Sequence, residues 1–133
     1  MNLPKKIFNF EYTKIKLSLL WLFVMLNYIY ADILTLMDSS ALNEILSGTL
    51  GITPTFLFLG AILMEIPIAM IFLSLLLKYK INRWANIISG AIKTLAVLGS
   101  MFVGTPALYY MFFGIIEIIA TIAIVVIAWR WKR

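Results

Sequence analysis

Residues 106–129 read PALYYMFFGIIEIIATIAIVVIAW, with Glu117 as the only charged side chain. Residues 54–77, PTFLFLGAILMEIPIAMIFLSLLL, have the same character and contain only Glu65. A helix needs about 20 mostly apolar residues to cross the hydrocarbon core of a bilayer. Because apolar residues would surround both helices on all sides, as contact with lipid requires, each stretch predicts a transmembrane helix.

The composition of the whole chain points the same way. Of the 133 residues, 63% are hydrophobic and 13% are charged, whereas an ordinary soluble domain has about 25% charged residues. Such a chain is too apolar to be disordered and exposes too much apolar surface to be a soluble globular domain. Cys and His are both absent, so we expect no catalytic residues of these types, no metal site and no cofactor.

Charged residues and the Gly-Thr-Pro sequence at 104–106 divide the chain into four apolar segments. We predict one membrane domain over residues 1–133, an all-α bundle of four transmembrane helices with short loops. The residues between the first two segments begin with Asp-Ser-Ser and place apolar residues on one helical face, which predicts a short helix at the outer interface. The predicted spans are 16–37, 54–77, 83–103 and 106–129, and the interfacial helix is 39–47.

The basic residues predict the orientation. Of the eleven, only Lys93 lies in the interior of a span. The other ten lie before or at the start of the first span, between the second and third spans or at the start of the third, or after the fourth. The positive-inside rule then places both termini in the cytoplasm, for a multi-pass protein of the cytoplasmic membrane. This bias also accounts for the net charge of +5, so we expect the lipid bilayer as a partner and no nucleic acid.

Four ionisable residues fall inside the predicted spans. Glu65, Lys93 and Glu117 lie near the middle of their helices, and Asp32 lies about two turns from the outer end of the first. A charge at the bilayer centre costs about 2.5–3.5 kcal/mol on insertion scales. We therefore expect these side chains to face one another inside the bundle, with Asn27 completing the cluster.

Further polar side chains recur at helical spacing in these segments, which predicts that one side of each helix faces the inside of the bundle. Three acids accompany one base in the spans, so full ionisation would leave a net charge of −2, which favours uptake of a proton, a metal cation or an organic cation. The candidate binding or proton site is Glu65, Lys93, Glu117, Asn27 and Asp32. The supporting polar residues are Tyr28, Tyr30, Asn86, Tyr110 and Thr121.

Three functional readings follow from this cluster. The first is a proton- or cation-linked transporter, or a membrane protein that binds a small cationic or lipidic ligand. Because four spans enclose little volume, we expect a transporter or ligand-binding protein of this size to act as a homodimer. The second is a structural or accessory membrane protein, in which the buried charges only fix helix packing. The third is a membrane-embedded enzyme that modifies a lipid. It ranks last, because the sequence has no nucleophile–base pair, metal motif or phosphate-binding loop. We therefore favour a function other than catalysis and leave the enzyme as the third alternative.

The chain also resembles a known family. Four stretches carry the resemblance and together extend from about residue 14 to residue 131: YIYADILTLMD, GAILMEIPIAM, NRWANIISGAIKT and FVGTPALYYMFFGIIEI. They are similar to a bacterial family of small four-span membrane proteins, a domain of unknown function. Its motifs include Asp32, Glu65, Asn86, Lys93, Tyr109 and Glu117. The resemblance implies four transmembrane helices and supplies no activity.

Overall fold

The computed structural model describes residues 3–102 and 106–132, and its side chains from Tyr12 onward. The described residues form five helices and no strand. The five helices are α1 (Leu3–Met37), α2 (Ser39–Ser47), α3 (Pro54–Leu76), α4 (Tyr79–Met101) and α5 (Leu108–Arg130). A helix covers most of each predicted range, but α3 ends at Leu76 rather than Leu77, α4 ends at Met101, and α5 begins at Leu108 rather than Pro106. The predicted end of the third span, Val103, lies outside the described residues.

The helix boundaries have local causes. α3 begins with Pro54 at its first position, where no N–H is needed, and the Thr53 side chain accepts a hydrogen bond from the Phe56 N–H. α2 is capped by Asp38, whose carboxylate accepts from the Ser40 N–H, and it ends at Gly48 with φ 74°. That left-handed conformation favours glycine. These capping residues therefore fix where α2 begins and ends and where α3 begins.

Three of the helices are long and apolar enough to cross a membrane. They are α3, α5 and the Tyr12–Met37 part of α1. α4 has the same length as α3 and α5 but is less apolar, because it carries Lys93 together with Asn82 and Asn86. The chain is thus an all-α protein with three apolar helices of membrane-spanning length and a fourth long helix that is more polar.

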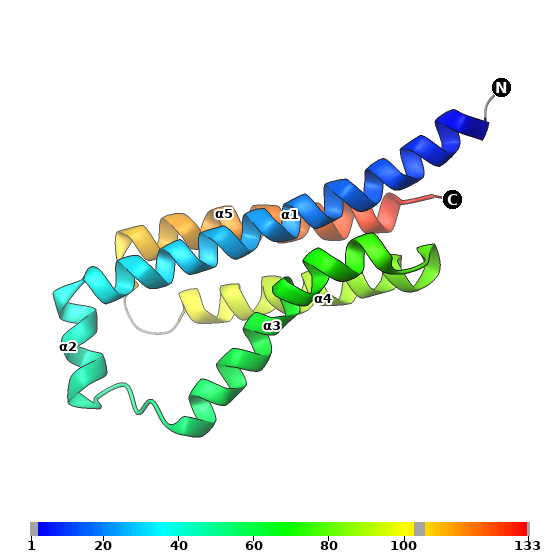
Figure 1. Ribbon diagram of the computed structural model, residues 1–133. Coiled ribbons are helices and arrows are strands. Elements are labelled where there is room, and N and C mark those ends of the chain that lie inside the picture. The colour runs from blue at the N-terminus through cyan, green and yellow to red at the C-terminus, as the bar shows by residue number, and fades with distance from the viewer. Residues whose placement is uncertain (1–2, 103–105, 133) are drawn as a thin grey trace.

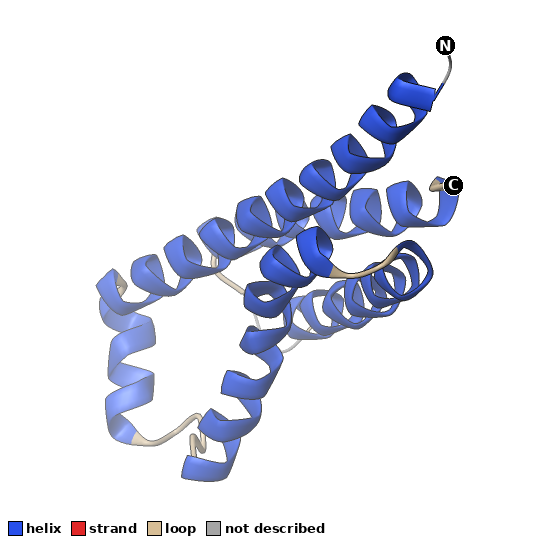
Figure 2. Ribbon diagram, turned by 45° about the vertical axis from the view of Figure 1, so that its right-hand side comes forward, coloured by secondary structure: helices blue, strands red, loops and turns tan. Residues whose placement is uncertain are grey.

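The four long helices pack in a fixed order. The most extensive contact is between α4 and α5, α1 packs on both α3 and α5, and α3 touches α4 less. Figures 1 and 2 show α1 and α5 running side by side, while the N-terminal half of α3 diverges from the other helices. The main hydrophobic core lies in the half of the molecule that contains both chain termini (Figure 1). It consists of Leu17, Trp21, Val24, Met70, Ala120, Ile124 and Trp131.

Candidate functional site

Lys93 is buried at the contact between α3 and α4, with 1% of its surface exposed. Its Nζ donates to the Leu63 carbonyl oxygen at 3.4 Å and to the Met64 Sδ at 4.0 Å. Pro67 has no N–H, so it cannot donate to the carbonyl four residues earlier, which is that of Leu63. A carbonyl that the proline leaves unpaired in α3 thus accepts a hydrogen bond from the Lys93 ammonium.

The third contact of the Lys93 ammonium is aromatic. Nζ lies 4.2 Å from the centroid of the Tyr28 ring, within the range of a cation–π interaction. Tyr28 comes from α1, so Lys93 on α4 joins α1 and α3. Lys93 forms no ion pair within 4.0 Å to any acid in the described part of the chain. A carbonyl, a thioether and an aromatic ring stabilise its charge instead.

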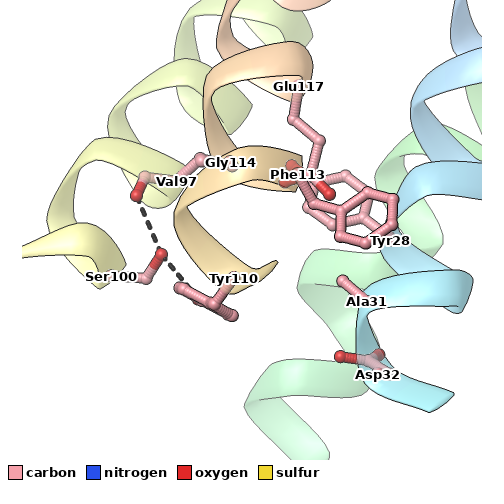
Figure 3. Close-up of a pocket in the computed structure, with 9 residues that line it drawn as sticks. All are labelled: Tyr28, Ala31, Asp32, Val97, Ser100, Tyr110, Phe113, Gly114 and Glu117. Carbon is pink, nitrogen blue, oxygen red and sulfur yellow. Dashed lines mark hydrogen bonds between the residues drawn. The ribbon is translucent and has the colours of Figure 1, made fainter. Parts of the chain in front are cut away.

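Glu117 lies on α5, and its side chain is 4% exposed. Its Oε1 atom is buried and has no hydrogen-bond partner among the described residues, and the same holds for the Tyr28 hydroxyl. Figure 3 shows the Glu117 side chain directed from α5 toward Tyr28 on α1. A buried acceptor without a partner is costly in a protein interior, so this carboxyl group has unused capacity to bind.

A cavity of about 60 Å³ lies beside these two groups. A volume of this size holds a few water molecules. The Tyr110 hydroxyl donates to the Ser100 Oγ at 2.9 Å, and Ser100 donates to the Val97 carbonyl, so one wall is already hydrogen-bonded. The cavity is lined by Tyr28, Ala31, Asp32, Val97, Ser100, Tyr110, Phe113, Gly114 and Glu117 (Figure 3).

The charges around the cavity are unequal. Glu117 and Asp32 line it, and Lys93 lies close enough to interact electrostatically with both. Two carboxylates and one ammonium leave a net charge of −1 when all are ionised. Asp32 is exposed, so the lining of the cavity includes one charged side chain that is accessible from the surface. The arrangement suits one positive charge that enters past Asp32.

Two members of the predicted cluster lie elsewhere. Glu65 is exposed on α3 and makes no hydrogen bond or ion pair with any described residue. Asn27 is half-buried and its Nδ2 donates to the Phe23 carbonyl at 2.8 Å, within its own helix. The expected convergence of all five residues is therefore corrected: Lys93, Glu117 and Asp32 come together, whereas Asn27 and Glu65 do not join them.

The supporting residues separate into three places. Tyr28 and Tyr110 line the cavity, while Tyr30 is exposed, with its ring 6.0 Å from that of Phe113. Thr121 belongs to the contact between α4 and α5, where its Oγ1 accepts from the Thr94 hydroxyl at 2.7 Å. Only the two cavity tyrosines of this group can touch a bound ligand.

Asn86 belongs to a buried network on the other side of Lys93. Its Oδ1 accepts from the Trp21 Nε1 at 2.7 Å and from the Ser74 hydroxyl at 3.3 Å. Its Nδ2 donates to both oxygens of Asn82, at 2.9 Å and 2.7 Å. All four side chains are fully buried. Because the donors and acceptors of Asn86 are paired, this network stabilises helix packing and has no free group for a ligand.

Several residues at the site are not among the predicted site residues. Ser100, Phe113 and Gly114 line the cavity, and Met64 contacts Lys93. The sequence does contain one relevant signal. The position of Pro67 predicts which backbone carbonyl of its helix loses its N–H donor, because a proline cannot donate to the carbonyl four residues earlier. Nothing in the sequence says which side chain reaches that carbonyl, because the donor comes from another helix.

Comparisons with known proteins assign no activity to this site. No curated protein and no solved structure matches the chain. A family model matches residues 5–133, almost the entire length, and its description gives no function. The chain therefore belongs to the family of unknown function DUF6326.

Proposed function

We propose that this protein crosses the cytoplasmic membrane four times, with both termini in the cytoplasm, and binds one small monovalent cation or a proton at Glu117. α4 supports the fourth span, since it has the length of α3 and α5 and packs along α5. Its polar residues Asn82, Asn86 and Lys93 are buried against other helices rather than exposed to lipid. An even number of spans also keeps the basic segments on one side.

The observation that carries the binding proposal is the state of the Glu117 carboxyl group. It is almost completely buried beside a cavity, and one of its oxygens has no partner in the described part of the chain. A purely structural carboxyl group at this depth would be expected to have a partner, because an unpaired one destabilises the fold. A bound proton or cation supplies the missing partner.

The charge and the volume of the site restrict the class of ligand that it can bind. Asp32 and Glu117 against Lys93 leave a net charge of −1, which a single positive charge neutralises. Carboxylate and hydroxyl oxygens from Asp32, Glu117 and Tyr28 suit a hard cation such as Na⁺ or a hydrated proton. A cavity of about 60 Å³ is too small for a lipid or for a drug-sized organic cation, whose pockets measure several hundred Å³.

A structural role is the second candidate, and one observation favours it. The Asn86 network shows that this chain uses buried polar groups to hold its helices. The two candidates make opposite predictions for Glu117. A structural residue stabilises the fold in the absence of ligand, whereas a binding residue leaves the fold intact when it is replaced.

The test is cation binding to the purified protein in mild detergent. We expect radioactive Na⁺ to bind with a stoichiometry of one per chain, or to be displaced by K⁺ if K⁺ is the preferred ion. If the cation replaces a bound proton, a pH-sensitive dye should detect proton release when the cation is added. Glu117→Gln should abolish the signal. Glu65→Gln is the matched control, because it makes the same chemical change outside the cavity.

Two outcomes would overturn the proposal. One is wild-type protein that binds neither Na⁺ nor K⁺ and takes up no more protons than Glu117→Gln in a pH titration. The other is equal loss of binding in Glu65→Gln and Glu117→Gln. Transport is a separate readout, measured as Na⁺ flux or pH change in proteoliposomes with wild type and Glu117→Gln compared side by side.

A further inference from the structure

Glu65 is the exception among the three charged residues that lie near the middle of a long helix. It lies in the middle of α3 and its side chain is exposed, whereas Lys93 and Glu117 are buried. Exposed apolar residues on a transmembrane helix need no explanation, because lipid covers them. A carboxyl group at that depth does need one, since lipid offers it no hydrogen bond.

The neighbours of Glu65 on α3 follow a seven-residue pattern. Residues 54–62 are exposed on every side of α3, whereas from Glu65 onward the exposed residues Glu65, Ile68, Phe72 and Leu75 follow spacings of three and four. Phe58 and Ala61 continue the same spacing toward the N-terminus of the helix, which makes six positions in all. This is the spacing of the a and d positions of a coiled coil, and it places the six on one seam for a facing helix. Other helices of the chain pack on the opposite side of α3, where Pro67, Met70 and Ser74 are buried.

We propose that this seam binds the same seam of a second copy of the chain, in a parallel dimer with α3 against α3. The basic residues orient every copy in the same direction, so a two-fold axis along the membrane normal brings the two Glu65 residues to the same depth. One protonated and one ionised carboxyl group then share a proton in a charge-assisted hydrogen bond. Ala61, one turn before Glu65, lets the two backbones approach closely.

A second copy fits better than an unrelated partner. A different protein would have to present a complementary polar group at the depth of Glu65, whereas a second copy always presents one. A polar residue at one a position of an apolar seam also fixes the register of a helix pair. The proposal does not depend on the cavity, because Glu65 is absent from its lining.

Cysteine cross-linking tests the seam directly. The chain has no cysteine, so single-cysteine variants need no prior changes. In oxidised membranes we expect disulfide-linked dimers for Phe58→Cys and Phe72→Cys. Leu59→Cys is the matched control, because Leu59 is 60% exposed against 66% for Phe58 and is its neighbour in sequence, but lies off the seam. Equal cross-linking of Phe58→Cys and Leu59→Cys would overturn the proposal.

The role of Glu65 is tested by the oligomeric state in detergent, measured by light scattering. Wild type and Glu65→Gln should be dimers, because two amides also hydrogen-bond to each other. Glu65→Lys should be a monomer, because two ammonium groups repel and have no shared acceptor. Differently tagged wild type and Glu65→Lys, when co-expressed, should copurify as a mixed dimer through a Glu–Lys pair. A monomeric wild type, or a dimer of Glu65→Lys as stable as wild type, would overturn the proposal.

Discussion

Lys93 donates to the carbonyl oxygen of Leu63, which Pro67 leaves without its helical N–H donor. The two residues are 30 positions apart and lie on different helices. A proline in a helix normally leaves a carbonyl that must find a donor elsewhere, and a buried ammonium must find acceptors. Here each requirement satisfies the other, so the proline and the lysine form one structural unit.

This pairing predicts thermodynamic coupling between Pro67 and Lys93. Pro67→Ala restores an N–H donor for Leu63, but it makes that donor compete with the Lys93 ammonium. In a Lys93→Met background the competition is gone, so Pro67→Ala should stabilise the protein by about 1 kcal/mol more than it does in wild type. Reversible unfolding of the two single variants and the double variant, in mixed detergent, measures the difference. Additive effects would show that the hydrogen bond has no energetic weight.

Much of the fold could be predicted from the sequence, because its helices are marked by long apolar runs. Thr53 and Pro54 mark the start of α3, and Asp38 and Gly48 bound α2. The cost of a charge in lipid predicted that Asp32, Glu65, Lys93 and Glu117 would all be buried; Lys93 and Glu117 are, whereas Asp32 and Glu65 are exposed. A span over 83–103 was predicted like the other three, but α4 is not among the three helices apolar enough to cross a membrane, because its polar residues lower its hydropathy.

The candidate site was only partly predictable, and Glu65 shows why. Glu65 and Glu117 are the same residue type in equally apolar helices, yet one is exposed and the other buried. An all-apolar helix carries no periodic signal for which side faces its neighbours. The sequence therefore indicates that a charge needs a partner, but not whether that partner lies in the same chain.

The Asn86 network should be essential to stability. Asn86→Leu leaves the Trp21 N–H and the Ser74 hydroxyl without their acceptor inside the bundle. Hydrogen bonds between membrane helices contribute on average about 0.6 kcal/mol each. The loss of several together predicts a decrease of about 1–3 kcal/mol in the free energy of unfolding. Thermal unfolding in detergent, with Tyr30→Phe on the exposed side of α1 as the control, measures this; equal melting of the two variants would contradict it.

Tyr28→Phe should leave the fold stable while it weakens cation binding. The Tyr28 hydroxyl is buried with no partner among the described residues, so removing it eliminates an unpaired polar group. The ring that contacts Lys93 remains. We expect a melting temperature equal to or above that of wild type, together with reduced Na⁺ affinity in the binding assay. A variant that melts clearly lower would mean that the hydroxyl has a structural partner.

Two glycines of α4 should respond in opposite ways to the same substitution. A Cβ at Gly90 would lie 2.6 Å from the Val125 Cγ2 and 3.3 Å from the Thr121 carbonyl oxygen, whereas one at Gly99 meets nothing within 4 Å. Gly90→Ala must displace the Val125 side chain or widen the spacing between α4 and α5, at a cost of about 1–3 kcal/mol. Gly99→Ala should be neutral or stabilise the helix by up to about 1 kcal/mol.

Thermal unfolding of Gly90→Ala and Gly99→Ala in the same detergent distinguishes the two effects. Because Val97 and Glu117 line the cavity from α4 and α5, a wider separation should also weaken cation binding in Gly90→Ala. Equal melting temperatures for the two variants would mean that α4 and α5 are less tightly apposed at Gly90 than the 2.6 Å approach requires. Weaker binding in Gly90→Ala with unchanged binding in Gly99→Ala would tie the cavity to the spacing of these two helices.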